Sequence, residues 1–370
     1  MRHRRSSALW EQASPYLLLA PFAFWIVVFF GYAFARTVYF SFTDYNLFSR
    51  PQWVGFRNYL NLLTDVQFGR AFKNSVMFAV VVTSLQTVFA LLLAVFMNMR
   101  IRGMRFFRGL YYMPSVTSSV VITLIFMWLF QRSGAVNYLT TKMLQYRAPL
   151  GAFICCALLL QVTAVSLERR LRRGASWLEP SLLLTSILIS AAVVWVIQFA
   201  SLVGPNPNIE PVRTIWLNTG QTIPQWAGPF GLPRPLGTIM MLNTWTTAPT
   251  MMLLFLAGLQ DIPKELYEAA AVDGATGFAA FAHITIPGLR HVTFLVVTMG
   301  LIGTLQMFDQ AAIVGDQAPL ESVITLAYFV YRNAFPPSAV PRIGAASAAA
   351  VFLAAFTLLL VLLQKKFTKA

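Results

Sequence analysis

Long stretches of the chain carry no charge, and this feature most limits its possible folds. The stretch from Ser75 to Met99, SVMFAVVVTSLQTVFALLLAVFMNM, contains no lysine, arginine, aspartate or glutamate. An apolar run of about 18 or more residues is long enough to cross the hydrocarbon core of a bilayer. Because backbone polar groups in lipid must be satisfied within the chain, a helix is the expected form of each span. We therefore expect an all-α, polytopic membrane protein surrounded by lipid.

The composition excludes several other classes of protein. Charged residues make up only 11% of the 370 and hydrophobic residues 57%, whereas soluble domains are about a quarter charged. The net charge of +15 does not indicate a nucleic-acid partner, because the basic residues lie in short loops and no nucleic-acid-binding motif occurs. Cys155 and Cys156 are adjacent within an apolar run, which favours packing thiols over a disulfide or metal site.

Hydropathy predicts eight spans, near residues 16–36, 74–98, 110–130, 149–167, 181–203, 236–258, 291–313 and 343–364. The first resembles a signal peptide in two respects, since RHRR precedes it and AFA at 33–35 is similar to a cleavage site. Its apolar stretch is, however, longer than the roughly 7–15 residues of a signal sequence, so an uncleaved first span is favoured.

The distribution of basic residues predicts the orientation of the chain. Lysine and arginine gather in short segments at alternate ends of the spans, at 2–5, 100–108, 169–173 and 365–369. Such segments face the cytoplasm under the positive-inside rule, which places both termini inside. The longer outer segments differ in character. An aromatic-rich region at 41–72 contains a predicted short interfacial helix near 56–63, and a Pro- and Gly-rich loop covers 204–235.

Catalytic motifs are missing from the sequence. No G-x-x-x-x-G-K-[ST] motif occurs, so ATP hydrolysis by this chain is not expected. The histidines His3, His283 and His291 have no carboxylate or cysteine at ligand spacing, and no nucleophile-elbow pattern is present. We expect no catalytic residue, no metal site and no cofactor in the chain. A membrane-embedded lipid or glycan enzyme stays an alternative, which detectable turnover by the purified chain would support.

The acidic residues argue against ion-coupled transport. Of the 13 aspartates and glutamates, only Asp309 falls within a predicted span, and it lies near the outer end. Ion-coupled transporters usually keep ionisable groups at mid-membrane, where such groups are costly and functional. A secondary transporter is therefore the disfavoured alternative, and any energy for transport should come from another chain.

The segment GLQDIPKELYEAAAVDGATGFAAFAHITIPGL, residues 258–289, separates the sixth and seventh predicted spans. It reads as two short helices. Asp261 is the predicted N-cap of the first, with Pro263 in its first turn and Gly274 and Gly277 as the residues able to end it. The second contains Phe278 and is expected to end before Pro287. Two interpretations are open on physical grounds: a small-residue face that lets a partner approach closely, or a solvated cytoplasmic loop.

This segment resembles the cytoplasmic signature loop of permease subunits in binding-protein-dependent ABC importers. The loop's pattern is E-A-A, three residues, G, about nine residues and I-x-L-P. The matching positions here are Glu268, Ala269, Ala270, Gly274, Ile284 and Pro287, with Ile286 in place of the usual leucine. Other stretches, among them WVGFRNYLNLL, FRGLYYMPSVTSSVVITLIFMWLF and TLAYFVYRNAF, are similar to the first-position permease of the carbohydrate-uptake branch (maltose or glycerol-phosphate type). The resemblance covers 15–145 and 236–367.

The resemblance implies a type I ABC importer permease fold of about eight transmembrane helices, a six-helix core plus an inserted hairpin. It divides the chain into a cytoplasmic tail (1–15), the first three core spans with the outer aromatic segment (16–145), the inserted two-span hairpin and outer loop (146–235), and the last three core spans (236–370), which include the coupling loop 260–290. The insert and the outer stretch VGDQAPLES, where relatives often carry Gly-Gly-Pro, depart from the family pattern.

The resemblance also implies partners and a mechanism. The coupling loop would dock on a cytoplasmic ATPase dimer, which binds ATP and Mg, and a second permease subunit and an extracytoplasmic solute-binding protein would complete the importer. Its place would be a bacterial or archaeal inner membrane, and its cargo a sugar or sugar-like solute, with a non-sugar solute as the alternative. The implied ATPase-coupling residues are Glu268, Ala269, Ala270, Asp273, Gly274, Ile284 and Pro287.

Polar residues within the core spans are the candidates for the solute path. They are Asn243, Thr244 and Trp245 in MLNTWTTAP, together with Gln306 and Asp309 in LQMFDQ. Sugars are bound by hydrogen bonds to their hydroxyls and by an aromatic face, which an amide and an indole provide. The alternative is that these residues only join helices through hydrogen bonds. The solute, the partner permease, the role of the insert and direct contact with solute stay open.

Overall fold

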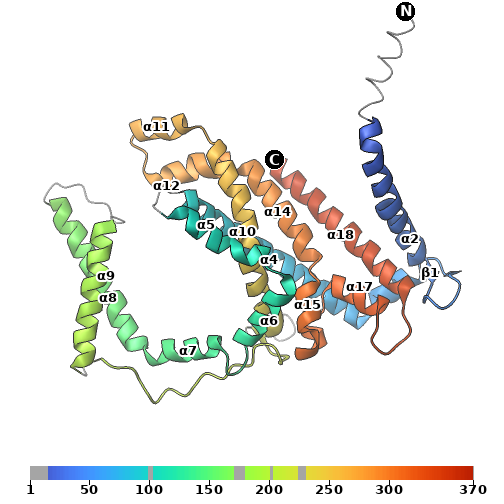
Figure 1. Cartoon of the computed structure of the whole chain (residues 1–370), viewed down its shortest axis with the longest axis horizontal. Helices are drawn as coiled ribbons and strands as arrows, with labels where there is room; N and C mark the ends of the chain where they lie inside the picture. Colours follow the sequence, from blue (N-terminus) through green and yellow to red (C-terminus); the bar gives the residue numbers. More distant parts are fainter. Residues whose placement is uncertain (1–15, 99–102, 171–179, 201–202, 224–230, 370) are drawn as a thin grey trace, which may run out of the picture. The chain divides into compact units, whose positions relative to one another are not determined.

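The computed structural model describes residues 16–98, 103–170, 180–200, 203–223 and 231–369, and most of them are helical (Figure 1). Sheet within these ranges is limited to two antiparallel pairs, β1 (Thr43–Asp44) with β2 (Gln52–Trp53) and β3 (Thr222–Ile223) with β4 (Leu232–Pro233). The expectation of an all-α protein is confirmed. The predicted tail 1–15 lies outside the described residues.

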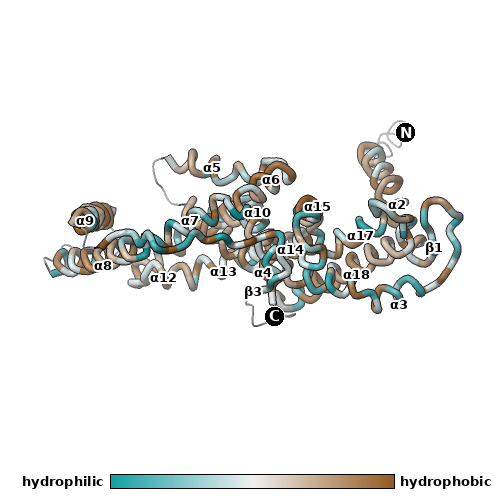
Figure 2. Tube along the Cα trace, turned by 90° about the horizontal axis from the view of Figure 1, so that it is seen from below, coloured by the Kyte–Doolittle hydropathy of each residue, from teal (hydrophilic) through white to brown (hydrophobic). Residues whose placement is uncertain are grey.

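Membrane spans account for most of the helical residues. Seven stretches of the described chain are long and apolar enough to cross a bilayer: Tyr16–Ser41, Val66–Asn98, Arg147–Glu168, Leu182–Phe199, Arg234–Asp261, Arg290–Gln317 and Ile343–Lys366. An eighth span results if Phe106–Val116 and Ser119–Leu129 are counted together, although they are bent by 98°. The prediction of about eight spans is confirmed. Figure 2 shows the contrast between the almost uniformly apolar α9 and the hydrophilic segment around β1.

The chain forms two compact units, of which the first comprises residues 1–124 and 217–370. Its N-terminal elements are η1 (Ile26–Gly31), α2 (Tyr32–Ser41), α3 (Arg57–Thr64), α4 (Val66–Asn98), α5 (Met104–Val116) and the start of α6 (Ser119–Leu129). Its C-terminal elements are α10 (Arg234–Asp261), α11 (Lys264–Val272), α12 (Gly277–Ala280), η3 (Phe281–Thr285), α13 (Ile286–Gly288), α14 (Arg290–Leu305), α15 (Asp309–Val314), η4 (Gly315–Gln317), α16 (Leu320–Val323), α17 (Leu326–Ala334) and α18 (Ile343–Lys369). The predicted interfacial helix near 56–63 is confirmed by α3.

The core of this unit lies where α10 and α14 pack against α4. Small side chains permit the close approach, since Ala90 and Ala94 of α4 and Ala248 of α10 are fully buried. Phe255 fills the space between them and is also fully buried. Dispersion contacts at this density hold membrane helices together, because lipid tails provide little hydrophobic drive for association.

The second compact unit comprises residues 125–216 and contains α7 (Ala135–Gln145), α8 (Arg147–Arg170) and α9 (Pro180–Phe199). The two long helices pack along each other as a hairpin, and the Ser186 hydroxyl donates to Gln161 Oε1 at 2.9 Å between them. The unit takes in α7 and leaves out residues 217–235, so its limits differ from the 146–235 given for the predicted insert. Most of the basic tip of the hairpin, 171–179, lies outside the described residues.

Two predicted spans are interrupted. The span predicted at 110–130 turns by 98° between α5 and α6, where Thr117 leaves the helical conformation with an extended backbone and ψ of 145°; Pro114, which cannot donate a helical hydrogen bond, lies in the last turn of α5. The helix of the span predicted at 291–313 ends at Leu305, and α15 begins only at Asp309. At both interruptions, backbone groups and polar side chains face the same region of the first unit.

Candidate functional site

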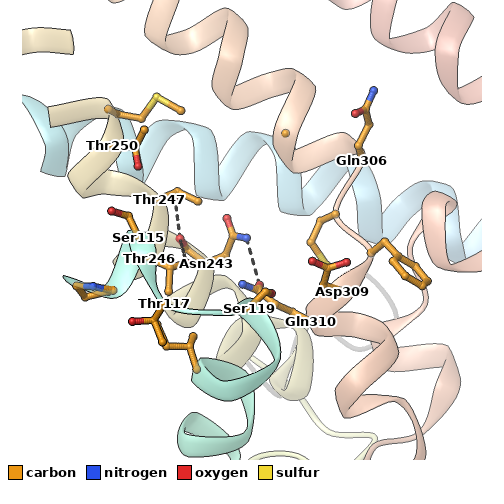
Figure 3. A pocket seen from close by; sticks show the side chains of 16 residues that line it. Ser115, Thr117, Ser119, Asn243, Thr246, Thr247, Thr250, Gln306, Asp309 and Gln310 are labelled. Atoms are coloured by element: carbon orange, nitrogen blue, oxygen red, sulfur yellow. Dashed lines mark hydrogen bonds between the residues drawn. The ribbon is translucent and has the colours of Figure 1, made fainter. Parts of the chain in front are cut away.

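A cavity of about 420 Å³ lies in the first unit where three helical segments meet (Figure 3). The break between α5 and α6, the middle of α10 and the break between α14 and α15 form its walls. Its polar lining residues are Ser115, Thr117, Ser119, Asn243, Thr246, Thr247, Thr250, Gln306, Asp309 and Gln310. Hydroxyls and amides predominate, and Asp309 is the only charged residue of the lining.

Hydrogen bonds fix the inner wall of the cavity. Asn243 Nδ2 of α10 donates to Gln310 Oε1 of α15 at 3.1 Å. The Thr247 hydroxyl donates to Gln86 Oε1 of α4 at 2.7 Å, which joins the third core helix to the same wall. Gln86 is buried, and its Nε2 has no hydrogen-bond partner among the described residues. The wall is therefore ordered by side chains that keep donors and acceptors near the cavity.

Three of the five predicted solute-path residues line this cavity, namely Asn243, Gln306 and Asp309. Thr244 and Trp245 do not. An α-helix turns about 100° per residue, so the cavity face of α10 recurs at 243, 246, 247 and 250 and excludes the two residues after Asn243. Trp245 is 45% exposed on another face, and the buried Thr244 hydroxyl has no partner in the described chain. An aromatic ring from the indole is thus not available to the cavity, although Phe308 lies in its lining.

The hydroxyl residues at the α5–α6 break were not among the predicted solute-path residues. Ser115, Thr117 and Ser119 line the cavity and belong to the stretch PSVTSS at 114–119. A proline followed by a cluster of hydroxyl residues inside an apolar run is the signal that could have located them. Such a cluster marks a place where helical hydrogen bonds are broken and replaced.

The segment between α10 and α14 forms a second candidate site, made of α11, α12, η3 and α13. Its signature residues are accessible: Glu268, Ala269, Asp273 and Gly274 are exposed and Ala270 is half-buried. Two apolar side chains stand out at its tip, Val272 at 88% and Phe278 at 81% exposed. Gly274 has a φ of 76°, which a residue with a Cβ adopts only with strain. The structure thus agrees with a turn at Gly274.

Apolar anchors attach this segment to the core. Ile262 and Leu289, at its two ends, are buried in the cluster formed by α4, α10 and α14. Ile284 packs against the same cluster, which places this signature residue on the inner side of the segment, whereas Pro287 is exposed. The Tyr267 and Thr285 hydroxyls are hydrogen-bonded at 2.9 Å. The segment therefore has an exposed tip on a base that is continuous with the helix core.

Two local predictions for this segment are wrong. Asp261 is not an N-cap: it is the last residue of α10, and Pro263 precedes α11, since its preset φ suits a helix start. Pro287 does not end the second helix, because helical backbone runs through Phe281–Thr285 as a π-helix and on to Gly288. The π-helical stretch leaves room for a proline ring that would otherwise clash. Thr276 caps the second helix by accepting from the Ala279 amide at 3.2 Å.

Groups able to hold a metal ion are not found among the described residues, where no three His, Cys, Asp or Glu side chains gather. The two candidate sites therefore consist of a polar cavity with one carboxylate, Asp309, in its lining and an exposed, anchored segment.

Comparisons with known proteins agree on one class. Residues 86–370 match the protein family described as "Binding-protein-dependent transport system inner membrane component". The arabinooligosaccharides transport system permease protein AraP of Bacillus subtilis (strain 168) is 27% identical, covering 87% of this chain and 79% of that protein. The lactose transport system permease protein LacF of Rhizobium radiobacter is 25% identical, covering 90% and 87%. The trehalose/maltose transport system permease protein MalF of Thermococcus litoralis is 26% identical, covering 86% and 83%.

A solved structure shares the fold. It is a bacterial ABC transporter involved in the import of the acidic polysaccharide alginate, and it superposes with a TM-score of 0.64 over 98% of both chains at 19% identity.

Proposed function

The chain belongs to the family of binding-protein-dependent transport system inner membrane components, and we propose that it imports a sugar or sugar-like solute with energy from a separate ATPase. The cavity between α5–α6, α10 and α14–α15 is the proposed solute path. A second permease subunit supplies the other side of that path, and an extracytoplasmic binding protein delivers the solute. The alternative is a permease for a non-sugar solute.

The chemistry of the cavity lining carries this proposal. Sugar hydroxyls both donate and accept hydrogen bonds, and the lining offers six hydroxyl-bearing residues at the α5–α6 break and on α10 besides the amides of Asn243, Gln306 and Gln310. The Asp309 carboxylate has two oxygens and can accept hydrogen bonds from two donors at once. The volume of about 420 Å³ suits a small saccharide unit. Relatives whose names specify arabinooligosaccharides, lactose and trehalose/maltose support the same solute class.

The segment from Pro263 to Leu289 is the proposed docking site of the ATPase dimer, which binds ATP and Mg. Its tip offers exposed apolar and small side chains, and its base is part of the helix core. One helix, α10, contributes both to the cavity wall and to the base of the segment. A displacement of the tip is therefore transmitted along a continuous helix to the cavity. On this proposal the segment faces the cytoplasm, as do both chain ends.

The test of ATP coupling compares Gly274→Asp with Gly277→Asp in the assembled importer. Both glycines are exposed on the segment, and a Cβ on either would meet no atom within 4 Å. Only Gly274 has a positive φ, so the same added charge strains one backbone and spares the other. We expect Gly274→Asp to lower ATP-driven uptake and ATPase co-purification at least about tenfold, and Gly277→Asp to lower them by less than about twofold.

Three outcomes would contradict the proposal. Co-purification of equal amounts of ATPase with both variants would show that the Gly274 turn has no role in docking. Uptake that persists without any ATPase would point to a secondary transporter. Uptake of a non-sugar solute with no competition from a panel of neutral mono- and disaccharides would favour the alternative cargo.

A further inference from the structure

A second cavity, of about 600 Å³, lies within the unit 125–216, between α7 and the extended segment 203–216. We call it the α7 cleft. Its lining residues are Arg132, Ser133, Asn137, Tyr138, Thr141, Lys142, Gln145, Pro211, Val212 and Arg213. None of these residues belongs to the cavity or segment described above, so the α7 cleft needs its own explanation.

Buried polar side chains fix the walls of the α7 cleft. Asn137 is 2% exposed. Its Nδ2 donates to the Thr214 carbonyl at 2.9 Å and to the Arg132 carbonyl at 3.0 Å, and its Oδ1 accepts from Trp216 Nε1 at 2.9 Å. The Thr141 hydroxyl accepts from the Val212 amide at 2.9 Å. The extended segment is thus pinned to α7 at several points, and the cleft is a built feature of this unit.

The charge of the α7 cleft has one sign. Arg132, Lys142 and Arg213 are exposed at its lining, and no carboxylate lines it. Within the described part of the chain, none of these three cations forms an ion pair with a carboxylate. Lys142 lies 5.7 Å from the centre of the Tyr138 ring and donates to Gln145 Oε1 at 3.3 Å, which holds its ammonium group at the cleft. Three unpaired cations around one concave surface favour an anionic ligand.

Helix α7 directly adjoins a membrane span, which favours a place for the cleft near the lipid headgroups. Helix α7 ends at Gln145, and the membrane span α8 begins at Arg147. In Figure 1, α7 extends from the end of α8 on the side away from α9. The side of α7 opposite Asn137 and Thr141 carries Leu139 and Met143, which are 56% and 66% exposed. An amphipathic helix with one apolar and one polar side that adjoins a span, here with Lys142 as its basic residue, is typical of a helix in the membrane interface.

From this charge, depth and geometry we propose that the α7 cleft binds the phosphate of an anionic phospholipid headgroup. Arg132 and Arg213 offer forked N–H donors to phosphate oxygens, and Lys142 offers a point charge. The hydroxyls of Ser133 and Tyr138 face the polar remainder of the headgroup. The site stabilises the α8–α9 hairpin at one leaflet, and it does not depend on the identity of the transported solute.

The experiment uses the purified full-length chain in phosphatidylcholine nanodiscs. Phosphatidylglycerol, at about a tenth of the lipid, is the anionic probe. Retained lipid is counted by native mass spectrometry. The test variant is Arg132→Gln/Lys142→Gln/Arg213→Gln. The matched control, Arg50→Gln/Arg57→Gln/Arg342→Gln, removes the same charge from exposed positions of the first unit. Circular dichroism and elution volume verify that both variants are folded.

We expect the wild type and the control to retain phosphatidylglycerol in preference to phosphatidylcholine and the test variant to lose that preference. Each surface cation contributes roughly a fivefold factor to binding of an anionic lipid, so the triple change weakens it on the order of a hundredfold. A variant with Arg132→Gln, Lys142→Gln and Arg213→Lys should recover part of the preference. Lysine returns the positive charge at this position but not the paired N–H donors of a guanidinium group.

Several outcomes overturn the proposal. An equal loss in the control variant assigns the effect to net charge alone. Saturable binding of inorganic phosphate in pure phosphatidylcholine, undiminished by added phosphatidylglycerol, assigns the cleft to free phosphate. Unchanged lipid retention in the test variant, together with loss of capture of the extracytoplasmic binding protein, makes the cleft a protein-docking surface.

Discussion

The cavity and the Pro263–Leu289 segment share helix α10 but are built in opposite ways. At the cavity, polar side chains face inward and bond to one another across helices, as Asn243 does with Gln310. At the segment, apolar side chains anchor the base while small and apolar residues such as Phe278 are exposed. The cavity is suited to recognise a small molecule, and the segment to be held by another protein. One helix can thus contribute to two different surfaces because its two ends carry different chemistry.

The largest effect is expected where the two regions are joined. A Cβ added at Gly258 of α10 would lie 2.6 Å from Val292 Cγ2 and 3.0 Å from Leu289 Cδ2. We expect Gly258→Leu to separate α10 from α14 and to abolish both uptake and ATPase co-purification, because overpacking costs about 1–3 kcal/mol and displaces the base of the segment. The control is Gly69→Leu in α4, where a Cβ meets nothing within 4 Å. Normal uptake by Gly258→Leu would show that the two regions are not linked through this crossing.

A change at the tip should affect the segment and spare the cavity. We expect Phe278→Glu to lower ATPase co-purification roughly tenfold, since an exposed aromatic at the centre of an interface is a typical hot spot. Solute binding to the assembled permease, measured by isothermal titration, should be unaltered. Leu63→Glu in α3, an equally exposed apolar position at 74%, is the control. Equal losses in both variants would refute a specific role for the tip.

A change in the cavity should do the reverse. Asn243→Leu removes the donor to Gln310 and an amide from the cavity lining, and a hydrogen bond lost to the solute costs about 1.5 kcal/mol at most for a neutral partner. We expect the KM of uptake to rise roughly tenfold while ATPase co-purification is unchanged. Trp245→Leu on the same helix, which does not line the cavity, should change KM by less than about twofold. A larger effect of Trp245→Leu than of Asn243→Leu would reverse the assignment of faces on α10.

The smallest effect is expected in the α8–α9 hairpin, outside both regions. Ser186→Ala removes the donor to Gln161, and interhelical hydrogen bonds in membranes are worth about 0.6 kcal/mol. We expect a slightly lower free energy of unfolding in mixed micelles and no change in uptake. Ser166→Ala, at an exposed position of α8, should be neutral in both measurements. A clear loss of uptake in Ser186→Ala would extend the transport machinery into the second unit.

Hydropathy predicted the membrane helices well because the absence of charge is a strong and local signal. The predicted span 74–98 lies within α4, and the predicted span 236–258 lies within α10. Hydropathy carries no information on the direction of a helix axis. The segment containing the 98° turn after Pro114 was therefore predicted as a single span. The spacing of the signature residues likewise located the segment and the turn at Gly274, whereas the N-cap assigned to Asp261 depended on where α10 ends.

Side-chain direction explains the mixed result at the cavity. Asn243, Thr244 and Trp245 are neighbours in sequence, but only Asn243 faces the lining. Polarity within a span indicates that a residue avoids lipid, and it does not distinguish a cavity from a helix contact. The hydroxyl residues from Ser115 to Ser119 carry a sequence signal for a helix break, but that signal does not say which way their side chains face. The residues that the sequence could not place are therefore those whose direction is set by tertiary structure.

The break between α5 and α6 has a consequence for how the cargo can be chosen. Helix α6 begins at Ser119, and the first amides of a helix have no partner within it. Main-chain groups at the cavity wall are present whatever side chains the sequence carries. On the proposed function, substitutions of the hydroxyl and amide residues in the lining would alter the side-chain contacts to the solute and leave this backbone contribution in place.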